Sequence, residues 1–171
     1  QKWRELYSKI ELNELSQLVN YCKNNDIIFI YAISPGLDIS YSSKSDFKYI
    51  LNKLHQLQAL GINGMAILFD DIPDSLSNED KNHFSSFAEA QSAIVNKIIQ
   101  KVSLDHWFFC PTVYCSHQAD FDLKNNKYLQ KIGLKLDKSI IVFWTGPEVI
   151  SQEIDKNHIQ ELKSVISNPI V

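Results

Sequence analysis

Two adjacent aspartates, Asp70 and Asp71, are the residues of this sequence best placed to do chemistry. They follow an apolar run, residues 64–69, and precede Pro73 by two positions. A buried strand that stops on two carboxylates loses their hydration unless they face a polar site. In a barrel or an open α/β sheet, active sites lie at such strand ends. Carboxylates there could transfer protons or bind a metal ion.

Four apolar runs, rich in β-branched and aromatic residues, predict the strands that would position this pair. Each run is continuous rather than alternating, which is typical of strands buried on both faces. Helical patterns separate the runs, so the sequence predicts a parallel sheet with right-handed crossovers. The predicted strands are 26–33, 64–69, 107–114 and 140–144.

Apolar residues at helical spacing predict the helices between these strands. Gly61 is expected to end the second helix, and Ser77, with Asp80 three residues later, to cap the third. Asp74 is a second candidate to cap the third helix. The predicted helices lie near residues 12–22, 47–61, 78–102, 127–136 and 148–167.

The predicted strands run into similar segments, which are polar or contain glycine or proline: 34–38, 70–74, 111–115 and 145–147. Loops of this kind on one face predict the catalytic face of a (β/α)₈ barrel. The chain supplies four strands and, at 169–171, the start of a fifth, so we expect part of a barrel. Gly36 is expected to adopt a positive φ, and Phe69 and Phe143 to face the barrel interior.

Composition narrows the function classes. A net charge of −3 over 171 residues gives no basic footprint for nucleic acid. No apolar stretch approaches the roughly 20 residues of a membrane span. The three cysteines show no disulfide spacing, which favours a reducing, intracellular compartment. Cys110 and Cys115 lack a zinc-binding spacing and the histidines are scattered, so no metal or cofactor is expected.

Motifs along residues 31–151 carry a family resemblance. They are YAISPGLDI at 31–39, LFDDI at 68–72, FSSFA with AQ at 84–91, FCPT with YC at 109–115, and WTGP at 144–147. In order and spacing they resemble glycoside hydrolase family 84, the family of the animal-type protein O-GlcNAcases.

The resemblance implies a TIM-barrel hydrolase that removes β-linked N-acetylglucosamine from Ser and Thr of nuclear and cytosolic proteins. Residues 1–171 would then be one partial catalytic barrel, from about strand 3 to the start of strand 7. Because strands at both ends are missing, we expect the isolated chain to have little or no activity. The implied partners are O-GlcNAc-modified proteins rather than nucleic acid or membrane, with a homodimer of the full-length protein left open. The implied location is the cytoplasm and nucleus.

The adjacency of the two carboxylates argues against the usual retaining mechanism. That mechanism needs carboxylates about 5–5.5 Å apart, one of them a nucleophile. Neighbours in a strand point to opposite sides, so these two could converge only where the backbone turns. Substrate assistance avoids the need for a protein nucleophile, because the 2-acetamido oxygen of the substrate attacks the anomeric carbon and forms an oxazoline.

The resemblance assigns the roles in that scheme. Asp70 would orient and polarise the acetamido N–H, while Asp71 would protonate the leaving oxygen and then activate water. Tyr114 would hydrogen-bond the acetamido oxygen or the developing charge. The N-acetyl methyl pocket would be formed by the remaining site residues, which are Thr145, Val149, Trp144 and Cys110.

Two other functions stay open on the sequence alone. The chain could be a non-catalytic isoform or binding remnant of the same barrel. It could also belong to a metal-assisted hydrolase in which Asp70 and Asp71 are ligands, with His117 the one histidine near a strand end. Without the motif match, an Asp-Asp pair after a strand is more often a turn or a helix cap.

Overall fold

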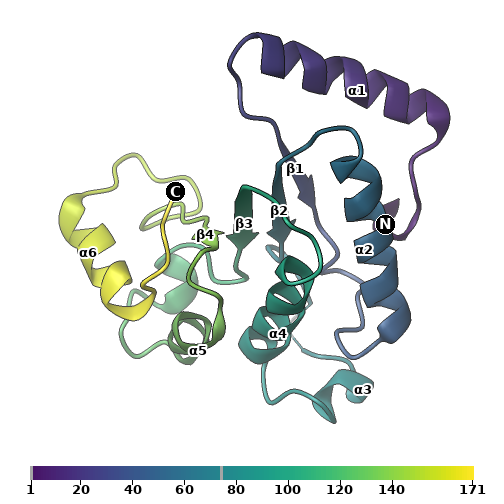
Figure 1. Cartoon of the computed structure of the whole chain (residues 1–171). Coiled ribbons are helices and arrows are strands. Elements are labelled where there is room, and N and C mark those ends of the chain that lie inside the picture. The colour runs from purple at the N-terminus through teal and green to yellow at the C-terminus, as the bar shows by residue number, and fades with distance from the viewer. Residues whose placement is uncertain (1, 74) are drawn as a thin grey trace.

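A parallel sheet runs through the centre of the chain, with helices packed around it (Figure 1). The computed structural model describes residues 2–73 and 75–171. The strands lie side by side in chain order: β1 (Ile30–Ile33), β2 (Gly64–Leu68), β3 (His106–Cys110) and β4 (Ile141–Val142). All neighbouring pairs are parallel, and Val142 forms a further parallel bridge with Ile170. The predicted strand order and direction are therefore confirmed.

The helices connect the strands as predicted, but their bounds differ: α1 is longer than predicted, α2 starts and ends three residues earlier, and the later helices are shorter. They are η1 (Lys2–Arg4), α1 (Lys9–Asn24), α2 (Lys44–Gln58), α3 (Asn78–Lys81), α4 (Phe87–Ile99), η2 (His117–Ala119), α5 (Lys127–Lys135) and α6 (Lys156–Val165). No helix within the described residues is both long and apolar enough to span a bilayer. Asp74, a candidate cap, lies outside the described residues.

The predicted helix 78–102 is two helices. Ser77 caps α3 by accepting the Asp80 N–H, as predicted. The chain then leaves the helix, and Ser86 caps α4 by accepting the Glu89 N–H. The chain therefore starts a second helix although the apolar spacing continues. The Ser86 hydroxyl takes the Glu89 N–H, which in one continuous helix would bond to a backbone carbonyl. Similarly, α6 begins at its Asp155 cap rather than at 148.

The two faces of the sheet are buried to different degrees. On one face, Phe69 packs against Phe109 and Tyr41 and is wholly buried. On the other face, Phe108 and Phe143 stack at 5.4 Å between ring centroids and stay half-buried. The prediction that Phe69 faces the barrel interior is therefore wrong, because strand alternation places it with the helices.

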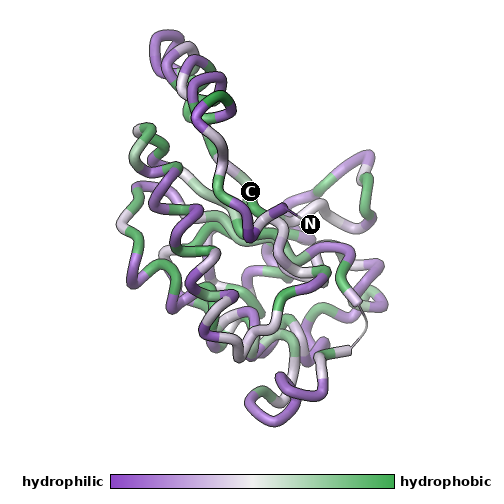
Figure 2. Tube along the Cα trace, turned by 90° about the vertical axis from the view of Figure 1, so that its right-hand side faces the viewer, coloured by the Kyte–Doolittle hydropathy of each residue, from purple (hydrophilic) through white to green (hydrophobic). Residues whose placement is uncertain are grey.

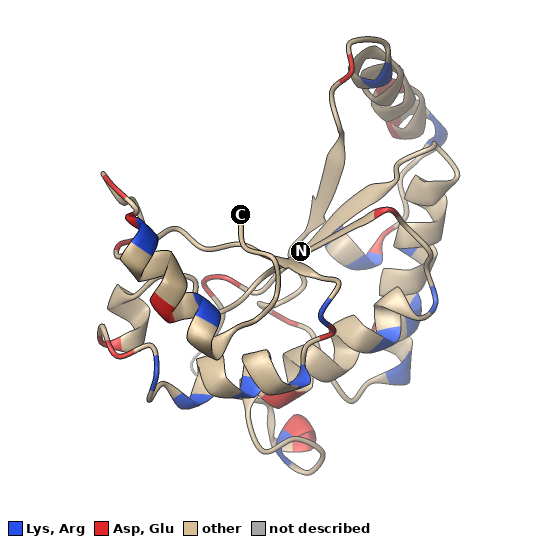
Figure 3. Cartoon of the chain, turned by 60° about the vertical axis from the view of Figure 1, so that its left-hand side comes forward, with Lys and Arg blue, Asp and Glu red and all other residues tan. Residues whose placement is uncertain are grey.

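Charge and hydropathy follow this arrangement. The strands are apolar in Figure 2, and in Figure 3 the lysine, arginine, aspartate and glutamate residues lie on the helices and loops, with both signs interspersed. Helix α1 stands apart from the other helices. Only Val19 and Cys22 of its side chains are buried, while Ile10 and Tyr21 are 75% and 64% exposed.

Two glycine predictions have different outcomes. Gly61 follows the end of α2 with a φ of 84°, a conformation that glycine adopts without penalty. Gly36 has no positive φ, so that prediction is wrong. A different constraint applies there: a Cβ on Gly36 would lie 2.3 Å from Cγ2 of Ile72.

Candidate active site

Asp70 and Asp71 lie where the chain leaves β2. The preceding residue still belongs to the ladder, since Phe69 N donates to Cys110 O at 3.0 Å. Asp70 is half-buried, whereas Asp71 is exposed and has a φ of 46°. This left-handed backbone costs a non-glycine residue about 1–2 kcal/mol and turns the chain sharply. The pair therefore sits on a backbone turn, which is the condition under which adjacent carboxylates can converge.

The end of β3 lies beside the pair, because Cys110 pairs with Leu68 in the sheet register. Burial, with added repulsion from Asp70 and Asp71, raises the pKa of the Cys110 thiol to about 12. Burial and the charge of Asp71, with a smaller contribution from Asp70, also raise the pKa of the Tyr114 phenol. The charges of Asp70 and Asp71 thus act on the thiol of Cys110 and on the phenol of Tyr114. The thiol and the phenol are neutral at physiological pH, so Tyr114 keeps the proton it needs to donate a hydrogen bond.

The loops after β3 and β4 are held together by backbone hydrogen bonds. Thr145 N donates to Tyr114 O at 2.9 Å, and Ser116 N donates to Gly146 O at 3.0 Å. The Thr145 hydroxyl donates to Glu148 O at 2.8 Å, which closes the turn after β4. The structure therefore brings together Tyr114 and Thr145, which are 31 residues apart in the chain.

The other two predicted pocket residues differ in placement. Val149 lies in the loop after β4 and is 52% exposed. Trp144 is buried, and its indole N–H donates to Nε2 of His158 on α6 at 2.8 Å with the two rings stacked. Trp144 therefore packs on the helix side of the sheet. Its assignment to the pocket wall stays a prediction that this contact does not favour.

A partly buried polar network braces the residue before Asp70, and the sequence reasoning missed it. The Thr112 hydroxyl donates to Phe69 O at 2.9 Å and accepts from Gln91 Nε2 at 2.8 Å. The Tyr128 hydroxyl donates to Gln91 Oε1 at 2.5 Å and accepts from Thr112 N at 2.9 Å. Gln91 and Thr112 fall inside the motifs at 84–91 and 109–115, which was the available signal.

The histidine named in the metal alternative has a different neighbour. His117 Nδ1 lies 2.8 Å from a carboxylate oxygen of Glu148, and both side chains are largely exposed. Within residues 2–73 and 75–171, no three or more His, Cys, Asp or Glu side chains are arranged to hold a metal ion.

Acid is expected to destabilise the fold through Asp38 and Asp80. Burial opposes ionisation of Asp38, but hydrogen bonds from Trp3 and Arg4 outweigh it and hold its pKa below the ordinary 3.8. Burial likewise opposes ionisation of Asp80, and hydrogen bonds from neighbours that include Ser42 hold its pKa below 3.8. This stabilisation is therefore complete above about pH 3.8 and is lost as the pH falls through the lower, folded values.

Urea unfolding at a series of pH values measures this effect. The free energy of unfolding should fall steeply below about pH 4, and Asp80→Asn should give a shallower fall than the parent protein. Equal slopes for the two proteins would contradict the assignment to Asp80.

Comparisons with known proteins agree over the whole chain. A family model described as beta-N-acetylglucosaminidase matches residues 1–171. Protein O-GlcNAcase of Mus musculus is 41% identical over 171 residues, which cover 99% of this chain and 19% of the mouse protein. The chain thus spans about a fifth of that relative's length.

Two solved structures show the same architecture. A mutant of Thermobaculum terrenum O-GlcNAc hydrolase superposes with a TM-score of 0.90 and 35% identity, covering 98% of this chain and 36% of that one. CpGH84B superposes with a TM-score of 0.83 and 28% identity, covering 97% of this chain and 29% of that one. The predicted fold class, a mixed α/β partial barrel, is confirmed.

Proposed function

Because this chain belongs to the beta-N-acetylglucosaminidase family, we propose that the protein carrying it removes β-linked N-acetylglucosamine from Ser and Thr side chains of proteins. One observation carries the proposal: two adjacent carboxylates follow a central strand, and the backbone turns at the second of them, where φ is 46°. The mouse relative is named for this activity, and the chain covers only part of that protein.

The turn suits a substrate-assisted, retaining reaction. The acetamido oxygen of the substrate attacks the anomeric carbon while the bond to the Ser or Thr oxygen breaks. Asp71, exposed on the turn, gives its proton to that leaving oxygen, and a protonated oxazoline (oxazolinium) forms that keeps its N–H. Asp71, now ionised, takes a proton from water, which attacks the anomeric carbon and opens the oxazoline. Two displacements on one carbon restore the original β configuration.

The neighbouring groups support the acetamido group. Asp70 accepts the acetamido N–H and stabilises the positive charge that develops on the ring. Tyr114 donates a hydrogen bond from its hydroxyl to the acetamido oxygen. Thr145, Val149 and Cys110 border the methyl group, where one methylene of extra size costs about 1–3 kcal/mol.

The setting is part of the proposal. Cys22, Cys110 and Cys115 are free thiols, which accords with a reducing compartment such as the cytoplasm and nucleus. The absence of nucleic-acid and membrane partners and the homodimer of the full-length protein stay predictions.

Assays of the full-length protein test the proposal. It should cleave an aryl N-acetylglucosaminide and an O-GlcNAc serine glycopeptide, and proton NMR should detect the β-anomer of N-acetylglucosamine first. Replacing the N-acetyl group by N-trifluoroacetyl should slow the reaction strongly, because fluorine withdraws electrons from the attacking oxygen. No turnover, or first release of the α-anomer, would overturn the proposal. The 171-residue chain serves as a comparison and should show little or no turnover.

A further inference from the structure

Two loops press against each other beside the carboxylate pair. We define the β1 loop as residues 34–43 and the β2 loop as residues 69–73 with 75–77. Gly36 of the β1 loop is buried, and a Cβ on it would lie 2.3 Å from Cγ2 of Ile72 and 3.2 Å from Cδ1 of Phe69. In the sequence, Phe69 directly precedes Asp70 and Ile72 directly follows Asp71. The β1 loop can approach the turn this closely only because position 36 lacks a side chain.

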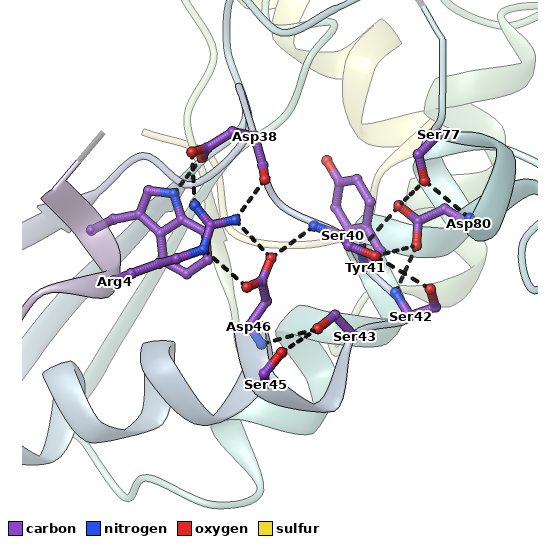
Figure 4. A network of polar contacts seen from close by, with 11 residues as sticks. Arg4, Asp38, Ser40, Tyr41, Ser42, Ser43, Ser45, Asp46, Ser77 and Asp80 are labelled. Carbon is purple, nitrogen blue, oxygen red and sulfur yellow. Dashed lines mark hydrogen bonds and ion pairs between the residues drawn. The ribbon is translucent and has the colours of Figure 1, made fainter.

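A second contact fixes the far end of the β2 loop (Figure 4). Asp80 is 1% exposed, and its carboxylate accepts hydrogen bonds from Tyr41 N at 3.1 Å and Ser42 N at 2.7 Å. It also accepts from the hydroxyls of Ser40 at 3.3 Å and Ser77 at 3.0 Å. One buried carboxylate therefore joins the last residue of the β2 loop to the backbone of the β1 loop.

The β1 loop is itself held from behind. Asp46, at the start of α2, accepts from Ser40 N at 2.9 Å and from Arg4 Nε and Nη2 at 2.9 and 2.8 Å. Arg4 also donates to the carbonyl oxygen of Asp38 at 2.6 Å. The β1 loop is thus tied to α2 and η1 and can act as a rigid support.

We propose that the β1 loop is a template that fixes the orientation of Asp71, with Gly36 and Asp80 as positioning residues. Neither residue touches the substrate in this scheme. The turn at Asp71 has a strained backbone, and such a conformation persists only where the surroundings determine it. The close approach of Gly36 to Ile72 fixes the loop conformation next to the carboxylate pair. The hydrogen bonds of Asp80 fix it where the loop enters α3. The inference rests on the proposed role of Asp71 as general acid.

The sensitivity of the rate to the leaving group tests this inference in the full-length protein. Asp80→Asn and Gly36→Ala should each lower kcat for an O-GlcNAc serine glycopeptide by about 10²-fold, the effect expected of a misplacement near 1 Å. The kcat for the dinitrophenyl glycoside should change far less, because that leaving group departs without a proton. KM should change little for either substrate. A smaller fraction of folded protein lowers both rates equally, so the ratio of the two kcat values is unaffected by partial misfolding.

Matched controls separate positioning from stability. A Cβ on Gly133 would lie 2.0 Å from Val165 O, so Gly133→Ala is at least as tight a substitution, at the α5–α6 contact. Gly133→Ala should lower the melting temperature and leave the kcat ratio unchanged. Ser40→Ala removes one bond to Asp80 and should shift the ratio in the same direction as Asp80→Asn, by less.

The outcomes are distinct. If Gly36→Ala and Asp80→Asn lower both rates equally, as Gly133→Ala does, the template is overturned and the two residues serve stability alone. If the parent protein cleaves neither substrate, the proposed function fails instead.

Discussion

Replacing Asp71 by asparagine is expected to lower the hydrolysis of an O-GlcNAc serine glycopeptide by about 10²–10⁴-fold, the usual contribution of a general acid. Asparagine has the shape of aspartate and tolerates the left-handed backbone at this position, where φ is 46°. It cannot give a proton to the leaving oxygen. The loss should therefore be chemical rather than structural.

Rapid-mixing kinetics with a dinitrophenyl glycoside give the sharper measurement. The Asp71→Asn variant should release the first equivalent of dinitrophenol quickly, because that step needs no acid, and then slow down. The second step lacks the base that activates water, so the oxazoline should accumulate. A slow first turnover would contradict the acid–base assignment.

Asp120→Asn is the matched control for this variant. Asp120 is also exposed and left-handed, with a φ of 52°, and it lies at the end of η2 rather than on the carboxylate turn. The same substitution on the same kind of backbone should leave both steps unchanged.

Replacing Asp70 by asparagine is expected to lower kcat by about 10²–10³-fold for both kinds of leaving group, the usual effect of losing one preorganised electrostatic contact. Asp70 acts on the acetamido group, so its loss slows oxazoline formation whichever group departs. The half-buried position of Asp70 strengthens this interaction relative to water. Steady-state kinetics with both substrates measure the effect.

The contrast between the two variants is the decisive result. Asp71→Asn should change the ratio of the two rates, and Asp70→Asn should keep it. Asp105→Asn, an exposed change just before β3 at the opposite end of the sheet, should affect neither. A strong leaving-group dependence for Asp70→Asn would reverse the two roles.

The strands, their order and the place of the carboxylate pair were predictable from the sequence. Continuous apolar runs identify strands in a parallel sheet, and the Ser77 cap was read correctly from its spacing to Asp80. These features depend on residues close together in the chain, where periodicity and capping act.

What the sequence did not reveal depends on contacts between distant residues. Gly36 was assigned a positive φ, whereas it is constrained by Ile72, 36 positions later in the chain. Gln91 and Thr112 lie inside motifs, but the motifs do not show that these residues join Tyr128 in one network, since its bonds span 16 to 43 residues. The contact of Trp144 with His158 on α6 likewise joins residues that the sequence does not connect.

The left-handed turn at Asp71 also restricts which acid can stand there. Aspartate and asparagine visit this conformation more readily than longer side chains do, because their short polar groups bond locally. A glutamate has the same proton chemistry, yet it would add backbone strain and carry its carboxylate one methylene further out. The backbone thus selects aspartate before any chemistry is considered. Substitutions at this position are consequently confined to residues that fit the left-handed turn, and among the acidic residues that is aspartate.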